Sequence, residues 1–241
     1  MKTIGLIGGM SFESTAVYYQ TLNQLARDRL GGLASAEILL HSVNFADIVA
    51  LQKAGRWQDA ATRLAAIARN LEAAGADCIL ICTNTMHKVA TEVQAAISIP
   101  LINIIDETAA ALKAAGMARP LLLATRYTME DGFYHRGMQS AAIDVMVPEE
   151  PGRSRVHDII FSELCAGKVL DSSRTELLAI IEAMKAEGAD SVILGCTEIC
   201  LTLDPAHLPL PGFDSTAIHC EAAARFAFAD ETALETERKY A

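Results

Sequence analysis

Two stretches of the sequence decide the fold: residues 75–85 read GADCILICTNT, and residues 188–198 read GADSVILGCTE. A shift of 113 residues (188 − 75) superposes one stretch on the other. Each begins with Gly-Ala-Asp and continues into an apolar run, which is typical of a β-strand buried on both faces of a parallel sheet. Each run ends in a polar turn, and the shift places Thr83 of the first turn on Cys196 of the second. The two stretches therefore predict two copies of one α/β half.

The segments around these two strands alternate between strand-like and helix-like patterns. Apolar runs of strand length occur at residues 2–7, 36–43, 77–82, 100–105, 120–125, 143–147 and 190–194. Helical patterns occur at residues 57–74, 107–115, 131–141 and 176–187, and three of them end at a glycine. This alternation favours an α/β fold in which mainly parallel sheets are flanked by helices. We predict two pseudo-symmetric domains, residues 1–105 with 212–241 and residues 106–211, with the active site in the cleft between them.

The composition of the chain excludes several classes of protein. The 241 residues are 51% hydrophobic and 21% charged, which is a globular balance. A formal net charge of −10 argues against nucleic-acid partners and an anionic membrane surface, since both require a basic footprint. No apolar run reaches the roughly 18 residues of a membrane span, and the N-terminus does not read as a signal peptide. Six cysteines show no spacing typical of a secreted disulfide framework, so we expect a cytoplasmic protein.

Both polar turns lie where an α/β protein usually binds its ligand. Ligands bind beyond the carboxyl ends of parallel strands, so Thr83 and Cys196 are expected to flank one ligand from opposite sides. Backbone N–H groups at the start of a following helix favour a carboxylate. The side chains of Asn84, Thr85 and Thr197 add hydrogen-bond donors. The alternative is that both are ordinary strand-to-helix turns with capping Thr and Asn residues.

Three motifs carry a resemblance to a known family. Residues 8–11 read GGMS and precede Ser14 and Thr15, residues 82–87 read CTNTMH, and residues 195–198 read GCTE. In this order and spacing they resemble the cofactor-independent aspartate/glutamate racemases along nearly the whole chain. Within that family, the chain is most similar to the L-aspartate/glutamate-specific, broad-specificity members. The resemblance implies two α/β domains with the substrate between them, and two cysteines that act as acid and base without pyridoxal phosphate.

The chain departs from this family at the first catalytic position. Most members have a cysteine directly before Asn-Thr, whereas this chain has Thr83 there and Cys82 one residue earlier. Successive side chains of a strand point to opposite faces, so Cys82 is not expected to replace the missing thiol. The L-specific subgroup also has threonine at this position.

The basic residues that many aspartate racemases use for the distal carboxylate are also missing. Residues 44–48 read NFADI and contain no arginine, and Cys165 lies where the family lysine would fall. Resemblance to the L-specific subgroup implies Gln52 as a neutral contact in their place. A strict preference for acidic side chains therefore does not follow from the sequence.

The chemistry expected of this site is removal of the Cα proton on one face and its return on the other. We expect Cys196 to deprotonate the L-isomer, and Thr83 to assist reprotonation, directly or through water, to the D-isomer. A thiol has a pKa of about 8.5, so we expect the following helix N-terminus to lower the pKa of Cys196. Glu198 would oppose that effect if it were close, so we expect it to hydrogen-bond the substrate or a neighbour.

Other residues receive supporting roles. The resemblance implies substrate contacts for Met10 and Ser11 in the first strand-end loop. The corresponding loop of the second half contains Thr125, Tyr127 and Thr128, which either bind the α-carboxylate or are simply turn-forming residues. His87 either steers the hydrogen bonding of the first turn or is structural.

We expect no metal and no cofactor. The Cys-x3-Cys pairs, Cys78 with Cys82 and Cys196 with Cys200, lack zinc-knuckle spacing, so the five cysteines other than Cys196 are expected to be structural. Residues 5–9 do not form a dinucleotide fingerprint.

Two other functions are compatible with the sequence. One is an enzyme similar to arylmalonate decarboxylases, in which a single thiol protonates a carbanion after loss of CO2. The other is a binding protein for small dicarboxylates that does not turn them over. The expected partner is a small amino acid, and a homodimer remains open because members of the family are often dimers.

Overall fold

The computed structural model describes residues 1–239, and the side chains of residues 1–229. The chain divides into two units: Met1–Asn103 with the C-terminal segment from His219 onward, and Ile104–Ile218. Each unit contains one parallel three-stranded sheet flanked by helices, which confirms the predicted α/β class with two sheets.

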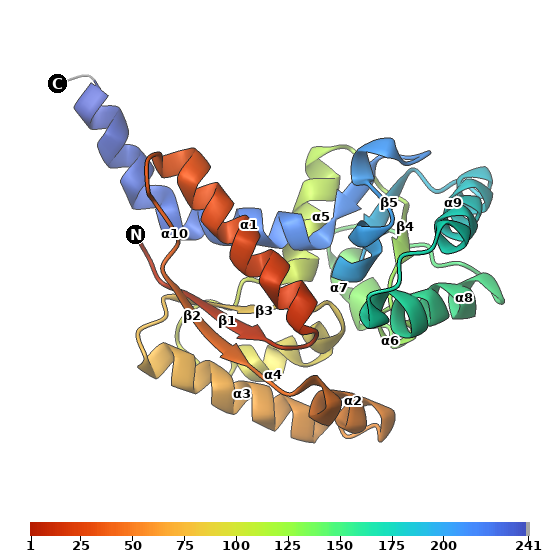
Figure 1. Cartoon of the computed structure of the whole chain (residues 1–241), viewed down its shortest axis with the longest axis horizontal. Coiled ribbons are helices and arrows are strands. Elements are labelled where there is room, and N and C mark those ends of the chain that lie inside the picture. Colours follow the sequence, from red (N-terminus) through yellow and green to blue (C-terminus); the bar gives the residue numbers. More distant parts are fainter. Residues whose placement is uncertain (240–241) are drawn as a thin grey trace. The chain divides into compact units, whose positions relative to one another are not determined.

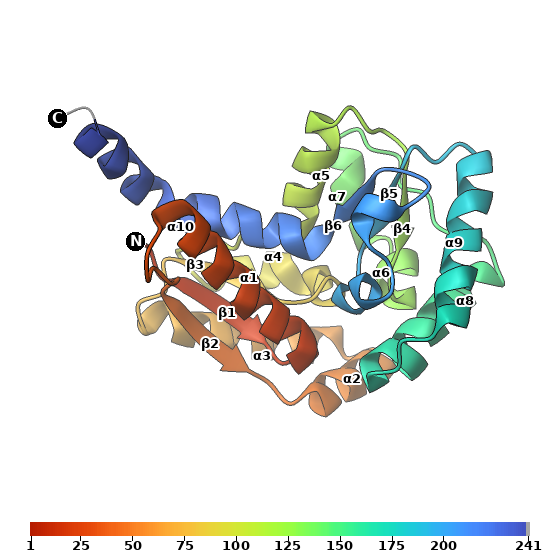
Figure 2. The same cartoon turned by 45° about the horizontal axis from the view of Figure 1, so that its top comes forward.

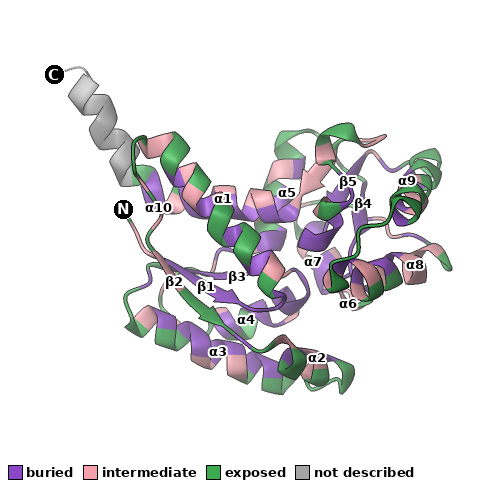
Figure 3. Cartoon of the chain, viewed as in Figure 1, coloured by how far each residue is buried: buried purple, intermediate pink, exposed green. Residues whose placement is uncertain are grey.

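The sheet of the first unit has the strand order β2-β1-β3 (Figure 1). Its strands are β1 (Ile4–Gly8), β2 (Ile38–Ser42) and β3 (Cys78–Ile81). Both pairings are parallel, and the register places Ile4 beside Ile38 on one side and beside Cys78 on the other. Strands β1 and β3 are buried along their whole length, whereas β2 is exposed toward its end (Figure 3).

Helices cover both faces of this sheet. Helices α1 (Phe12–Leu30) and α10 (Ser215–Lys239) pack on one face, and α3 (Trp57–Ala73) packs on the other (Figures 1 and 2). Successive strand residues point to opposite faces of the sheet and therefore contribute to two different hydrophobic cores. Leu6 and Leu80 pack in the core beneath α1, and Ile7 and Ile79 pack in the core beneath α3. The remaining elements of the unit are α2 (Phe45–Lys53), the 3₁₀ turn η1 (Thr85–Val89) and α4 (Ala90–Gln94).

Helix α3 follows directly from its sequence pattern. Its fully or nearly fully buried residues include Ala60, Leu64, Ile67 and Leu71, which recur at the spacing of one helical face. Gly75 follows its end with a backbone φ of +99°, a conformation that favours glycine and stops the helix.

The sheet of the second unit has the strand order β4-β5-β6, again with parallel pairings. Its strands are β4 (Pro120–Leu123), β5 (Ser191–Leu194) and β6 (Gly212–Asp214). The helices of this unit are α5 (Ile104–Ala114), α6 (Arg126–Glu130), α7 (Phe133–Ser140), α8 (Gly152–Asp158) and α9 (Asp171–Ala186). The shorter segments are the π-helix η2 (Ile159–Glu163) and the 3₁₀ turns η3 (Leu164–Ala166), η4 (Thr197–Leu201) and η5 (Pro205–His207).

The two sheets repeat one another in detail. In unit 1, Leu101 forms a single parallel bridge with Ile79 at the free edge of β3, the place that β6 occupies beside β5. In unit 2, Met146 forms a bridge with Leu121 at the free edge of β4, the place that β2 occupies beside β1. The internal repeat read from the sequence thus extends to the order of the strands.

Four predictions about the elements and the domain bounds differ from the structure. Residues 100–105 and 143–147 form only these single bridges, not full strands. Helix α5 already begins at Ile104, where Asp106 and Glu107 in its first turn favour a helix N-terminus. Residues 212–218 belong to the second unit and not to the first, because β6 pairs with β5. Residues 240–241, at the end of the first predicted domain, lie outside the described residues.

Among the described residues, every helix is either too short or too polar to span a membrane.

Candidate active site

The first predicted turn directly follows β3. The Thr83 amide donates to the carbonyl of Ile81 at 2.8 Å, which turns the chain out of the strand. Cys82 is fully buried in the core between the sheet, α1 and α10, and Thr83 is partly exposed. Burial raises the pKa of the Cys82 thiol. The side chain of Cys82 therefore does not take the place of a thiol at position 83.

His87 is bound to this turn from one helical turn further along the chain. Its Nδ1 donates to the carbonyl oxygen of Thr83 at 2.9 Å, and its amide donates to the carbonyl of Asn84. Burial lowers the pKa of His87 to about 4, so its ring is neutral at pH 7. The contact by which His87 would steer the first turn is thus present.

A second buried histidine, His219 of α10, lies against the first. The two rings meet edge to face with centroids 5.7 Å apart. His219 Nε2 donates to the carbonyl of Ile102 at 2.7 Å, which leaves Nδ1 to accept from the Tyr18 hydroxyl at 2.8 Å. Burial lowers the pKa of His219 to about 3. Sequence reasoning missed Tyr18 and His219, because only the fold brings them beside residues 83–87.

The loop after β1 lies beside the same turn. The Ser14 hydroxyl donates to the carbonyl of Cys82 at 3.2 Å, which joins the carboxyl ends of the two strands. Ser11 caps α1 by accepting from the Ser14 amide, and both Met10 and Ser11 are buried. Gly9 has a φ of +84°, and a Cβ there would lie 2.3 Å from the carbonyl oxygen of Val43. The close approach of Val43 therefore explains why the second residue of the GGMS motif, Gly9, is a glycine.

Gln52 lies on α2 in the same unit. Its side chain is only 7% exposed, and its amide nitrogen lies 3.2 Å from the sulfur of Met86, in the CTNTMH motif. The structure thus connects Gln52 to the first turn. Asn84 and Thr85 are buried in that turn as well.

The second predicted turn directly follows β5. Cys196 is 9% exposed, and its thiol donates to the Glu198 carboxylate at 2.9 Å. Burial, together with the negative charge of Glu198, raises the pKa of Cys196 well above its ordinary value. The expectation of a lowered pKa is therefore wrong for the free protein. The physical reason is that Cys196 is buried and that the Glu198 carboxylate faces the thiol, effects that outweigh the backbone N–H groups of the following 3₁₀ turn.

The hydroxyl of Thr197 is held by its own unit. It pairs with the hydroxyl of Thr216 at 3.1 Å, and the neighbouring Ser215 donates to the carbonyl of Leu194 at the end of β5. The start of α10 thereby fixes the GCTE turn, a contact that the sequence alone did not indicate.

The loop after β4 lies at the same end of the second sheet. The hydroxyls of Thr125 and Thr128 are 3.2 Å apart, and both residues are buried. The Tyr127 ring is partly exposed and meets the ring of His157 on α8 edge to face.

The predicted site residues are divided between the two units. Unit 1 contains Met10, Ser11, Gln52, Thr83, Asn84, Thr85 and His87, and unit 2 contains Thr125, Tyr127, Thr128, Cys196, Thr197 and Glu198.

The other cysteines are free thiols. Cys78 and Cys220 are fully buried like Cys82, whereas Cys165 and Cys200 are partly exposed and pack against the core of unit 2. Among the described residues, no three histidine, cysteine or acidic side chains gather in a way that would hold a metal ion.

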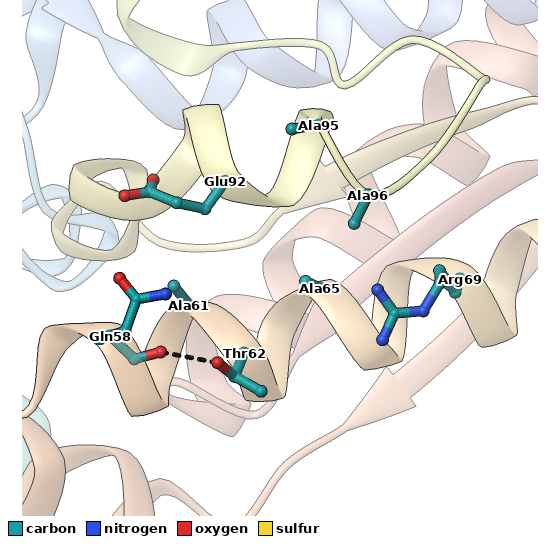
Figure 4. A pocket seen from close by; sticks show the side chains of 8 residues that line it. All are labelled: Gln58, Ala61, Thr62, Ala65, Arg69, Glu92, Ala95 and Ala96. Atoms are coloured by element: carbon teal, nitrogen blue, oxygen red, sulfur yellow. Dashed lines mark hydrogen bonds between the residues drawn. The ribbon is translucent and has the colours of Figure 1, made fainter.

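A pocket of about 360 Å³ in unit 1 lies between α3 and α4 (Figure 4). Its lining residues are Gln58, Ala61, Thr62, Ala65, Arg69, Glu92, Ala95 and Ala96. None of these is a predicted site residue, so the pocket is separate from the strand-end motifs.

Comparison with known proteins identifies the class to which this fold and these motifs belong. The Asp/Glu/Hydantoin racemase family matches residues 7–223. The chain therefore belongs to this family, and it is an isomerase of the amino-acid racemase type.

Solved structures agree with this assignment. A proposed Asp/Glu racemase from Yersinia pestis is 47% identical, with a TM-score of 0.89 over 95% of this chain and 100% of that chain. An aspartate racemase homologue from Pyrococcus horikoshii OT3 is 32% identical, with a TM-score of 0.83 over 94% of this chain and 99% of that chain. The broad specificity amino-acid racemase RacX of Bacillus subtilis is 24% identical over 61% of this chain, and the match spans 63% of its own length.

Proposed function

We propose that this protein interconverts the L- and D-isomers of aspartate or glutamate without pyridoxal phosphate, with wider amino-acid tolerance left open. Cys196 removes the Cα proton of the L-isomer. Thr83 assists delivery of a proton to the opposite face, directly or through water. The observation that carries the proposal is the position of these two residues, each two residues beyond the end of the buried strand in its own half of the repeat.

Glu198 gives Cys196 a way to become a thiolate despite its raised pKa. The thiol already donates to the Glu198 carboxylate at 2.9 Å, so the proton can move to that oxygen without leaving the pair. After this transfer the carboxyl is neutral, and its charge no longer opposes the thiolate. The thiolate then takes the Cα proton and returns to the thiol form. Glu198 releases its extra proton to solvent, and solvent restores the proton that the Thr83 side gave to the substrate.

The substrate carboxylates are recognised by local donors, because a net charge of −10 gives no general attraction for a dicarboxylate. We assign the α-carboxylate to the hydroxyls of Thr125 and Thr128 with Tyr127 beside them. Asn84, Thr85 and Thr197 add polar contacts at the two turns, and Met10 and Ser11 border the first of them. Gln52 is the neutral contact for the distal group, since its amide lies against the CTNTMH motif. The proposed racemase is cytoplasmic.

A second candidate is a single-thiol enzyme of the arylmalonate decarboxylase kind. One observation favours it: Cys82 is fully buried and turned away from the first turn, so Cys196 has no partner thiol at position 83. In that reaction Cys196 would protonate a carbanion left by loss of CO2. A dicarboxylate-binding protein without turnover is the remaining alternative.

Exchange of the α-proton with solvent separates these three functions. The protein is incubated in D2O with L-aspartate, L-glutamate and a set of neutral L-amino acids, and the α-proton signal is followed by NMR. We expect the signal to disappear for at least one acidic amino acid while the D-isomer accumulates in chiral chromatography. Absence of exchange with every amino acid would contradict the proposal. CO2 release from an aryl malonate would then favour the decarboxylase, and tight dicarboxylate binding alone would favour the binding protein.

A further inference from the structure

His157 of α8 contacts the loop to which the α-carboxylate has been assigned. The backbone N–H of Arg126 donates to His157 Nδ1 at 3.2 Å. The His157 ring also contacts the ring of Tyr127, with centroids 6.3 Å apart, and the ring of Phe161, with centroids 4.7 Å apart. One side chain thus contacts two consecutive residues in the first turn of α6, between Thr125 and Thr128.

The direction of this hydrogen bond fixes the protonation state of the ring. A backbone N–H only donates, so Nδ1 carries no proton and the single ring proton lies on Nε2. A protonated histidine has N–H groups at both positions and accepts at neither. Protonation of His157 therefore breaks the bond to Arg126 and brings two N–H groups face to face.

The surroundings of His157 keep the ring neutral near pH 7. Partial burial and the charge of Arg126 lower its pKa, while Asp158 on its own helix and Glu130 on α6 raise it by smaller amounts. The Arg126 side chain is itself held on α8 by a 3.2 Å contact with Ser154. A further tie between the two helices is the ion pair of Arg153 with Glu130 at 2.8 Å. Neither of these two contacts involves the imidazole ring, so protonation of His157 acts first on its bond to the Arg126 amide.

We propose that His157 is a positioning residue for the carboxylate-binding loop: its neutral ring holds the Arg126 amide and thereby fixes the Thr125–Thr128 hydroxyl pair and the Tyr127 ring. The expected effect on racemisation kinetics rests on the proposed function. The contact between His157 and the Arg126 amide does not depend on that function.

Two variants separate the hydrogen bond from the titration. In His157→Asn, the side-chain oxygen takes the place of Nδ1 and accepts from the Arg126 amide, but it does not ionise. In His157→Leu, the acceptor is lost at every pH. His207→Asn serves as the matched control, because His207 is an exposed histidine of the same unit.

The first readout does not require activity. In ¹H–¹⁵N spectra, the Arg126 amide of the wild type and of the His207→Asn control should shift with pH together with the His157 ring. The same amide should not titrate in His157→Asn. An Arg126 amide that titrates equally in His157→Asn and in the wild type would overturn the contact.

The second readout is the pH dependence of racemisation. As the pH falls from about 7.5 to about 5, the KM of the wild type should rise relative to that of His157→Asn, while kcat changes equally in both. In His157→Leu, loss of one hydrogen bond should raise KM about 2- to 10-fold with kcat little changed. Equal KM profiles in wild type and His157→Asn, combined with the NMR titration, would overturn the positioning role. Absence of α-proton exchange in the wild type would refute the proposed function and leave the NMR result standing.

Discussion

The buried histidines His87 and His219 should make the first unit unusually sensitive to acid. An unfolded histidine has a pKa of about 6.5, whereas burial lowers the pKa of His87 to about 4 and that of His219 to about 3. Between these values the unfolded chain binds protons that the folded chain does not. Linkage then requires that stability falls as the pH falls through this window, and that it is fully present above pH 7.

The size of the effect follows from the same values. Between pH 7 and pH 5, protonation of one unfolded histidine stabilises the unfolded state by about 2 kcal/mol, while both buried rings stay neutral. The two histidines together should therefore lower the free energy of unfolding by about 4 kcal/mol. This is a large part of the roughly 5–15 kcal/mol that is typical of a folded domain.

Urea unfolding at several pH values measures this directly. The fluorescence of Trp57, the single tryptophan, reports on unit 1, which contains both histidines. In His87→Asn, the side-chain amide keeps a donor for the Thr83 carbonyl but does not ionise. The loss of stability between pH 7 and pH 5 should be smaller in this variant by about 2 kcal/mol, or about 1 M in urea midpoint.

The exposed His41 provides the matched control in the same unit. His41→Asn should keep the full acid sensitivity of the wild type. An equal loss of stability in His87→Asn and in the wild type would show that the buried His87 ring is not the group responsible for the acid sensitivity.

Three further changes test the site and its supports. Glu198→Gln should lower the pKa of Cys196, since it removes a negative charge that faces the thiol. Alkylation of Cys196 at neutral pH, followed by peptide mass spectrometry, should therefore be faster in this variant. An unchanged rate would argue against the contact between Cys196 and Glu198. Gly9→Ala should destabilise unit 1 by more than about 2 kcal/mol in urea unfolding, because its Cβ would lie 2.3 Å from the Val43 carbonyl oxygen. Gly55→Ala, at a positive φ with open space around it in the same unit, should cost only about 1 kcal/mol. Tyr18→Phe should cost about 1–3 kcal/mol in the same assay, because it leaves the buried Nδ1 of His219 without its donor, and an unchanged midpoint would contradict that hydrogen bond.

The internal repeat made much of the fold predictable. Residues 75–85 and 188–198 have the apolar runs of buried strands, and β3 and β5 are found within them. The structure of residues 100–105 was harder to predict from their apolar run alone. Pro100 lacks the N–H that a strand would use, and the acidic residues after Ile105 favour the start of a helix. Residues 212–218 could not be assigned to a unit from the sequence, because their place is decided by the pairing of β6 with β5, a contact between segments far apart in the chain.

The candidate site was predictable where it follows local sequence order. Thr83 and Cys196 each lie at the end of a strand because the apolar run stops there. The expected pKa of Cys196 was wrong, because the spacing of Cys196 and Glu198 does not tell whether the carboxylate turns toward the thiol. Tyr18, His157 and His219 were missed, because each reaches its turn from another helix.

The most direct test of the central claim is α-proton exchange by the Cys196→Ser variant. Exchange of L-aspartate and L-glutamate in D2O is followed by NMR, and binding of the same amino acids is measured by calorimetry. Cys200→Ser, which removes a partly exposed thiol four residues away, is the matched control. We predict that Cys196→Ser still binds its substrate and loses exchange, while Cys200→Ser retains both. Full exchange by Cys196→Ser would contradict the assignment of Cys196 as the base.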